Sequence, residues 1–236
     1  MLMANYRIAD LLIEIDSWGR IEKQARPYLT DEEGTPDIIV HSEAEALHKD
    51  NPHLSLDDCE YLSTGATFYR QLLCFDGMML HSSCVVVDGK AYLFTAPSGV
   101  GKSTHVQLWL RLFGDRAYVL NDDKPALRAI DGKIYVYGTP WSGKYDYNRN
   151  ERVELGGIAV VKRAAENSIR PLTPKEGIYA LLNQTARTQV DYVVDQCLET
   201  IQKIVSTGKL FELSCNMDIS AARLSYETMS GKRIEE

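Results

Sequence analysis

A glycine-rich segment near the middle of the chain contains the residue types that bind phosphate groups. Residues 98–104 read SGVGKST and lie between an apolar run and an amphipathic helical pattern. Glycines let successive backbone N–H groups turn toward one anion, and the start of a helix adds a partial positive charge. The lysine can contact the outer phosphates, and the hydroxyl after it can join the coordination shell of Mg²⁺. The segment predicts a P-loop that binds ATP with Mg²⁺ through Ser98, Gly99, Val100, Gly101, Lys102, Ser103 and Thr104.

The P-loop pattern has one departure, because Ala96 stands where the usual motif begins with glycine. That position mainly needs a small side chain, and the rest of the motif is intact. The alternative is a chance Gly- and Ser-rich turn with a surface lysine. The apolar strand before the loop and the helix after it favour the nucleotide site, because the motif requires this context.

Two adjacent carboxylates, Asp122 and Asp123, end the next apolar run, 20 residues after Lys102. Ligands of α/β sheets gather at the carboxyl ends of strands, so this pair is expected beside the phosphates. One carboxylate can hold Mg²⁺, and the other can accept a proton from an attacking hydroxyl. A simple Asn-Asp-Asp turn is the alternative.

Three further features are weaker candidates. His81, in the strand before the P-loop strand, could ligate metal or transfer a proton, or it could be a satisfied core residue. Glu154 could be a second carboxylate directed at Mg²⁺, or part of a solvated strand entrance. The glycine-rich loop 138–144 could face the substrate through Trp141 and Lys144; a rigid turn with a buried tryptophan is equally compatible.

The elements that must position these residues form a mixed α/β pattern. Two apolar runs, Met78–Val87 and Lys90–Thr95, are separated by Asp-Gly and predict a hairpin that leads into the P-loop. Ser103–Phe113 has the apolar spacing of a helix, and Ala117–Leu120 is a short strand before the acidic pair. Further strands are expected at Lys133–Tyr137, Gly156–Lys162 and Lys209–Ser214, and further helices at Pro174–Gln184, Val190–Ser206 and Asp218–Ser230.

The amino-terminal third has a different pattern. Strands are expected at Tyr6–Ile15 and Asp37–Ser42, an exposed loop at His48–Asp58 and a helix at Tyr61–Phe75. We therefore expect a β-rich part over residues 1–58, packed on a P-loop domain over residues 59–236. The alternative is that the first strands extend the main sheet as edge strands.

Composition limits the class of protein. The 236 residues carry a net charge of −7, which argues against nucleic acid and anionic membranes as partners. No apolar run is long enough to span a membrane, and the first residues lack the features of a signal peptide. The five cysteines form no CxxC pair, which is typical of reduced thiols. These observations predict a cytoplasmic protein and leave open a homo-oligomer.

The order of motifs resembles a known family. A histidine-bearing strand (Leu80-His81-Ser82-Ser83), a hairpin, SGVGKST and a strand ending in Asp-Asp are similar to the kinase domain of HPr kinase/phosphorylase. The nucleotide-binding core of phosphoenolpyruvate carboxykinase is more distantly similar. The resemblance covers residues 78–162 and implies a P-loop on a mixed β-sheet. It also implies that Asp122 accepts the proton, that Asp123 and Ser103 are directed at the metal, that Lys102 binds phosphate and that His81 is catalytic, with Glu154 loosely matching an acidic strand entrance.

The sequence and the resemblance together predict a kinase that uses ATP and Mg²⁺. It would transfer the γ-phosphoryl group to a hydroxyl, with serine as the favoured acceptor, on a peptide, a protein or a small molecule. One alternative is a nucleotide-dependent lyase like the carboxykinases, although the chain is short for one. Another is a non-catalytic module that senses ATP.

Overall fold

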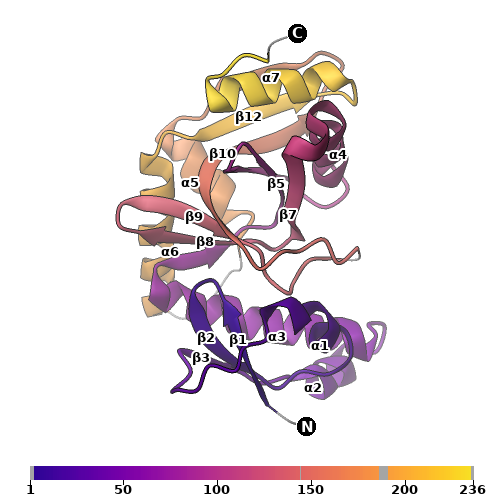
Figure 1. Cartoon of the computed structure of the whole chain (residues 1–236), viewed down its shortest axis with the longest axis vertical. Helices are drawn as coiled ribbons and strands as arrows, with labels where there is room; N and C mark the ends of the chain where they lie inside the picture. Colours follow the sequence, from indigo (N-terminus) through magenta and orange to yellow (C-terminus); the bar gives the residue numbers. More distant parts are fainter. Residues whose placement is uncertain (1–2, 144, 186–190, 235–236) are drawn as a thin grey trace.

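The computed structural model describes residues 3–143, 145–185 and 191–234, with the backbone alone described for 191–193. The molecule has two tiers along its longest axis, and the chain termini lie near opposite ends (Figure 1). One tier contains the amino-terminal elements, and the other contains a large mixed sheet with helices on both faces. The predicted α/β fold with a mixed sheet and a small amino-terminal sheet is therefore confirmed.

Among the described residues the large sheet has nine strands, and most pairs of neighbouring strands are antiparallel. β10 (Arg152–Arg163) is the long central strand, and it runs parallel to β6 (Lys90–Thr95) and to β12 (Leu210–Cys215). The remaining strands are β4 (Gly77–Met79), β5 (Ser82–Val87), β7 (Ala117–Asp123), β8 (Ala126–Ile130), β9 (Lys133–Tyr137) and β11 (Ser168–Pro171).

The hairpin of β5 and β6 forms where the sequence predicts it. Asp88 and Gly89 have φ values of 50° and 72°, which are the left-handed conformations of a two-residue hairpin turn. The turn pairs Val87 with Lys90 and Ser82 with Thr95. β5 also pairs with β7 in the antiparallel sense, so β6 and β7 run in the same direction on either side of it. The ends of β6 and β7 consequently lie at the same edge of the sheet.

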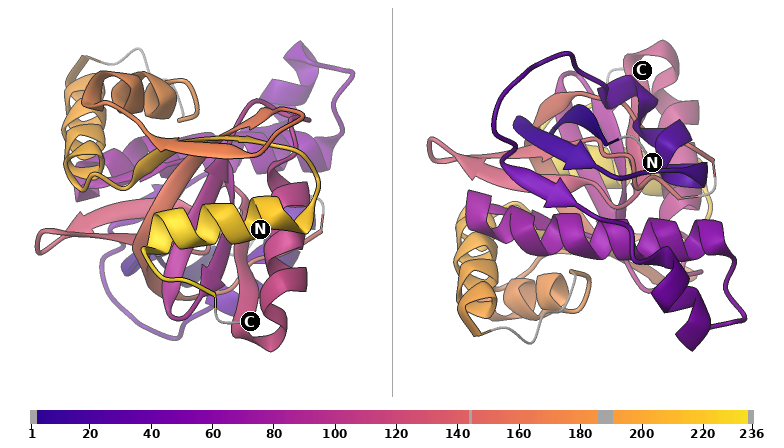
Figure 2. Two further views of the ribbon diagram at one scale, coloured as in Figure 1. Left: turned by 90° about the horizontal axis from the view of Figure 1, so that it is seen from above. Right: turned by 90° about the horizontal axis from the view of Figure 1, so that it is seen from below.

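Helices cover the two faces of the large sheet (Figure 2). Alternate residues of β5 face opposite sides: Cys84 and Val86 join the core under α5 and α6, whereas Val85 and Val87 join the core under α4 and α7. A capping box of Thr173 and Glu176 lies at the amino-terminal end of α5. The bounds are α4 (Lys102–Phe113), α5 (Pro174–Leu182), α6 (Asp191–Ser206) and α7 (Ile219–Ser230).

The amino-terminal tier has its own three-stranded sheet, so its strands are not edge strands of the main sheet. Its elements are β1 (Ala4–Ile8), β2 (Leu11–Ile15), α1 (Gly19–Ala25), β3 (Ile38–Val40), α2 (Ala44–Asp50) and α3 (Leu56–Leu72). Within the described part of the chain, short 3₁₀ helices also form at Arg26–Tyr28, Leu73–Phe75 and Gly114–Arg116.

Several expected elements differ in their bounds. Tyr6–Ile15 is a hairpin because Ala9 and Asp10 have positive φ values of 54° and 61°. The expected loop at His48–Asp58 instead contains the end of α2 and the start of α3, where the Ser55 side chain caps the helix by accepting from the Asp58 N–H at 3.1 Å. The expected division after residue 58 falls inside α3. Among the described residues, no helix is both long and apolar enough to cross a bilayer.

Candidate functional site

The loop between β6 and α4 contains two glycines with positive φ values. Gly99 and Gly101 have φ values of 79° and 125°, and a Cβ at either position would meet no heavy atom within 4 Å. Glycine is therefore required by the backbone conformation and not by crowding. α4 begins directly at Lys102, so the unpaired N–H groups of its first turn face the same space as the loop.

Lys102 lies inside this loop. Its side chain is 9 % exposed, and Nζ donates to the carbonyl oxygen of Ala96 at 3.0 Å. Burial lowers the pKa of Lys102, while the charges of Asp123 and Asp122 oppose that effect. The ammonium group is thus partly desolvated, which strengthens its attraction for an anionic ligand, whereas the two carboxylates would need a cation beside them before an anion could approach.

Arg163, at the end of β10, braces the loop from its outer side. Its Nε donates to the carbonyl of Val100 at 3.0 Å, and its guanidinium also donates to the carbonyl of Gly99. These bonds hold the two carbonyl groups outward, which leaves the opposite side of the loop to its N–H groups. Arg163 is not among the site residues predicted from the sequence, because it follows Lys102 by 61 residues and lies in no motif.

Asp122 lies beside the hydroxyl of Ser103 at the start of α4. Ser103 Oγ donates to Asp122 Oδ1 at 2.9 Å, and Ser83 donates to the same carboxylate oxygen from the neighbouring strand β5. The two serine hydroxyls are 3.2 Å apart. The order of the strands produces this cluster. β5 lies between β6 and β7, and its Ser83 pairs with Asp122 of β7. Ser83 was part of the family resemblance but was not predicted as a site residue.

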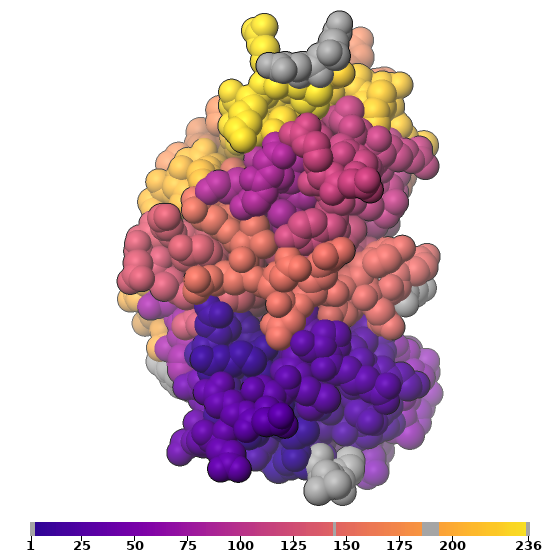
Figure 3. Space-filling view, viewed as in Figure 1, coloured from indigo at the N-terminus to yellow at the C-terminus, as the bar shows by residue number. Residues whose placement is uncertain are grey.

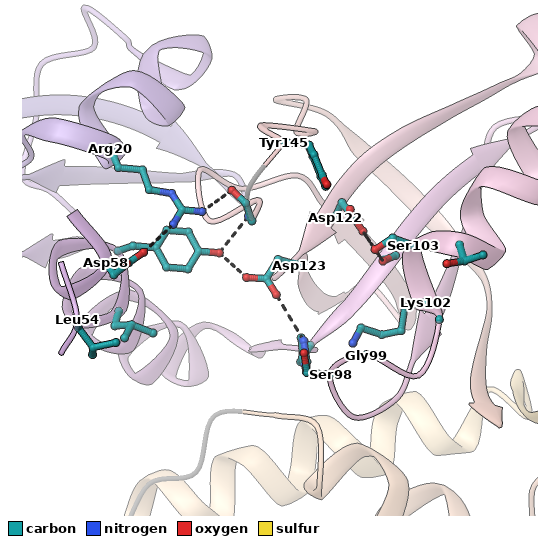
Figure 4. Close-up of a pocket in the computed structure, with 17 residues that line it drawn as sticks. Arg20, Leu54, Asp58, Ser98, Gly99, Lys102, Ser103, Asp122, Asp123 and Tyr145 are labelled. Atoms are coloured by element: carbon teal, nitrogen blue, oxygen red, sulfur yellow. Dashed lines mark hydrogen bonds and ion pairs between the residues drawn. The ribbon is translucent and has the colours of Figure 1, made fainter. Parts of the chain in front are cut away.

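Asp123 faces a different group of side chains (Figure 4). Its Oδ2 accepts from the Tyr61 hydroxyl at 2.5 Å and from Lys124 Nζ at 2.7 Å, and its Oδ1 is 3.5 Å from His81 Nε2. Burial alone would raise the pKa of Asp123, but Lys124, Tyr61 and His81 outweigh it and hold the pKa below its ordinary value. Asp123 is therefore ionised at neutral pH.

His81 is a neutral imidazole beside Asp123. Burial, followed by the charge of Lys102, lowers the pKa of His81 below its ordinary value, and the opposing charge of Asp123 does not compensate. The side chain is 32 % exposed, so one side of the ring remains accessible. A neutral imidazole can accept a proton or ligate a metal ion.

These groups surround a cavity of about 570 Å³, a volume within the range of small-molecule sites. Its floor contains every predicted P-loop residue except Val100, together with His81, Asp122 and Asp123. The facing wall comes from the amino-terminal tier (Figure 4) and consists of Arg20, Leu54, Asp58, Tyr61 and Leu62. The Arg20 guanidinium lies 4.0 Å from the centre of the Tyr61 ring and donates to the carbonyl of Gly143.

The loop that joins β9 to β10 runs across the boundary between the two tiers (Figure 3). Gly143 and Tyr145 of this loop line the cavity, but Trp141 does not. Trp141 is fully buried, stacks on Phe68 with ring centres 4.8 Å apart, and donates to Thr64 at 3.1 Å. The substrate contact predicted for Trp141 is therefore corrected to a core role. Lys144 lies outside the described residues.

Glu154 is separated from the cavity. It pairs with Lys90 at the beginning of β6, whereas the P-loop follows the end of that strand, five residues or about 17 Å away. Its carboxylate forms ion pairs with Lys90 at 2.8 Å and Lys133 at 3.6 Å. These contacts correct the metal role predicted for Glu154, which instead forms ion pairs with two surface lysines.

Among the described residues, no group of three or more His, Cys, Asp or Glu side chains forms a metal cage. Mg²⁺ usually needs only one or two protein carboxylates, because phosphate oxygens and water complete its coordination shell. Ser103 and Asp122, with oxygen atoms 2.9 Å apart, fit that smaller requirement.

Comparison with solved structures gives a weak likeness to this chain. No family model and no curated protein matches the chain. A solved structure, the Hpr(Ser) kinase/phosphatase from Coxiella burnetii, is similar at 15% sequence identity with a TM-score of 0.30. The match covers 51% of this chain and 93% of that chain. A likeness of this size identifies no family.

Proposed function

We propose that this protein is a kinase that uses ATP and Mg²⁺ to phosphorylate a hydroxyl group. The observation that carries the proposal is the 2.9 Å contact between Ser103 Oγ and Asp122 Oδ1 at the start of α4. A P-loop hydroxyl beside a carboxylate at the end of a neighbouring strand is the pair that holds Mg²⁺ in P-loop enzymes. Asp123 lies next to this pair, where a second substrate can reach it.

The family resemblance implies that Asp122 accepts the proton and that Asp123 is directed at the metal. The contacts of the two side chains favour the reverse assignment. Asp122 contacts Ser103 and Ser83, so we assign it to the metal. Asp123 contacts Tyr61 of the cavity wall and His81 of the cavity floor, so we assign it to the acceptor hydroxyl. Asp123 would orient that hydroxyl and take its proton as the new O–P bond forms and ADP leaves.

The other residues contribute position and charge. Lys102 would contact the outer phosphates, and the loop N–H groups would hold the remaining oxygens. Mg²⁺, when bound, neutralises charge on the β- and γ-phosphates. Tyr61 and Lys124 both donate to Oδ2 of Asp123 and so fix the position of its carboxylate. Catalysis of this type depends on positioning and electrostatic stabilisation more than on covalent chemistry.

The acceptor would enter between the P-loop and the amino-terminal tier. That wall presents Arg20 and Asp58, which form an ion pair at 3.4 Å, and the partly exposed side chain of Leu62. A hydroxyl carried by a peptide, a protein or a small molecule is compatible with such a mixed surface. Serine remains the acceptor that the sequence analysis favours.

The test uses γ-labelled ATP with Mg²⁺, a serine peptide library, free serine and glycerol. Alanine versions of the peptides are the matched control. We expect label on at least one hydroxyl acceptor and none on the alanine peptides. Tight ATP binding without transfer to any acceptor would support a sensing module instead, and labelling that requires oxaloacetate would support a lyase.

Asp122→Asn and Asp123→Asn test the two assigned roles. Asp122→Asn should raise the Mg²⁺ concentration for half-maximal activity at least tenfold. Asp123→Asn should leave that concentration unchanged and lower the transfer rate by about 10²- to 10⁴-fold, the usual contribution of a general base. The reverse pattern would restore the roles that the resemblance implies.

A further inference from the structure

A second cavity, of about 400 Å³, lies on the other side of the P-loop from the aspartates. Helix α4 provides one wall through Thr104 and Leu108. The ends of β10 and β12 provide another wall, which includes Val161, Ala164 and Met217. None of the catalytic groups assigned above lines this space.

The register of the sheet produces the second cavity. The last residue of β6, Thr95, pairs with Val160 of β10, and β10 continues to Arg163. β12 ends at the same level as β10, because their last residues, Cys215 and Arg163, are paired. The two strands therefore extend about 10 Å beyond the end of β6 and form a ledge beside the P-loop. Ligands of α/β sheets bind outside the carboxyl ends of such strands.

The two cavities meet at the P-loop, because Gly101 and Thr104 line both of them. Their chemistry differs. The first is lined by Lys102 and by three aspartates, Asp58, Asp122 and Asp123, whereas the second has no carboxylate among the described residues that line it. Its surface is largely apolar, and Met217 is 77 % exposed at its rim. A nucleotide has the same division, with charged phosphates at one end and a flat, weakly polar base at the other.

His105, at the base of the second cavity, does not add a charge there. Burial lowers its pKa to about 4, so the imidazole is neutral at neutral pH. Its Nε2 atom is 3.0 Å from the hydroxyl of Ser225, and its Nδ1 atom is 3.9 Å from the sulfur of Cys215. The ring nitrogens are therefore engaged within the protein, and the surface offered to a ligand is that of a packed aromatic ring.

We propose that this second cavity holds the base and ribose of the nucleoside triphosphate whose phosphates occupy the P-loop. The proposal rests on the function proposed above. Leu108, Val161 and Met217 would contact the base, as apolar side chains do in most small-molecule sites. Arg163, fixed by the carbonyls of Gly99 and Val100, offers a planar guanidinium at the cavity edge. Because no carboxylate is among the described residues that line the cavity, none of them would accept a hydrogen bond from the N–H groups of guanine through a carboxylate.

Two neighbouring alanines provide a matched test. Ala164 lines the second cavity and is partly buried, whereas Ala165 is exposed and lines neither cavity. Binding of ATP and of inorganic tripolyphosphate, which has no base, would be measured by calorimetry for the wild type, Ala164→Phe and Ala165→Phe. We expect Ala164→Phe to weaken ATP binding at least tenfold and tripolyphosphate binding less than twofold. Ala165→Phe should change neither.

Equal loss of both ligands in Ala164→Phe, or loss of neither, would overturn the base site while leaving the P-loop assignment intact. If the wild type binds neither ligand, the proposed function fails as well. Photolabelling of the wild type with 8-azido-ATP gives a measurement that does not depend on the variant folding. Label in the peptides that contain Leu108, Ala164 or Met217 supports the site, and label confined to the amino-terminal wall of the first cavity contradicts it.

Discussion

Replacing Tyr61 by phenylalanine removes one hydroxyl from the centre of the candidate site and keeps the ring. That hydroxyl donates to Asp123 at 2.5 Å and accepts from the Gly143 N–H at 3.2 Å. A hydrogen bond to a charged group contributes about 1.5–3 kcal/mol, against about 0.5–1.5 kcal/mol for a neutral pair. The free energy of unfolding of Tyr61→Phe should therefore fall by about 1.5–3 kcal/mol near neutral pH.

Tyr69→Phe is the matched control for this substitution. Tyr69 lies in the same helix and is also buried, but its hydroxyl contacts the neutral oxygens of Lys124 and Thr139. Its loss should lower the free energy of unfolding by about 0.5–1.5 kcal/mol at every pH. The difference between the two variants isolates the charge of Asp123.

The pH dependence of this difference has a definite sign. The folded-state pKa of Asp123 is depressed, so its stabilising contribution is present above the ordinary aspartate range and is lost as the pH falls through the lowered value. Removing the Tyr61 hydroxyl raises that pKa. Urea unfolding at about pH 7 and at an acid pH below the folded-state pKa of Asp123 should show that the loss of unfolding free energy in Tyr61→Phe shrinks toward that in Tyr69→Phe in acid. Equal costs at both pH values, or a cost that grows in acid, would refute the charged contact.

Three further predictions concern residues whose roles the structure defines. Trp141→Ala should lower the free energy of unfolding by about 3–5 kcal/mol, measured by urea unfolding, because Trp141 is fully buried against Phe68. Glu154→Gln should leave the rate of ATP turnover unchanged and alter stability by at most about 1 kcal/mol, because its ion pairs lie at the surface. Loss of turnover in that variant would contradict its placement away from the site. Titration of His81 by NMR should give a midpoint below the ordinary value of 6.5, because burial and Lys102 favour the neutral ring; a midpoint above it would show that Asp123 dominates.

The local parts of the fold could be predicted from the sequence. The strand, glycine-rich loop and helix around Lys102 are consecutive in the chain, so apolar periodicity and two glycines were enough to define them. The same local reasoning missed α2 and the start of α3, although Ser55 followed by Asp58 is a helix-capping pattern. Residues 48–58 are polar and contain a proline, a composition typical of loops, and this composition obscures the cap.

The non-local contacts could not be predicted in the same way. Tyr61 and Arg163 reach the site from a helix and a strand far away in the sequence, and no motif marks either residue. Glu154 was misplaced because a single sequence does not reveal which end of a strand lies beside the P-loop. The adjacent Asp122 and Asp123 side chains have different partners, and that difference depends on the pairing of β7 with β5 and the position of α3.

Calorimetric titration of ATP, with and without Mg²⁺, into the wild type and Lys102→Ala tests the central claim most directly. Lys102 is buried inside the loop, so its replacement by alanine should remove the main positive charge that contacts the phosphates. The circular dichroism spectrum should stay unchanged. We predict Mg²⁺-enhanced ATP binding in the wild type and at least a hundredfold weaker binding in the folded variant. Equal ATP affinity in the two proteins, or no ATP binding by the wild type, would contradict the assignment of this cavity as a triphosphate site.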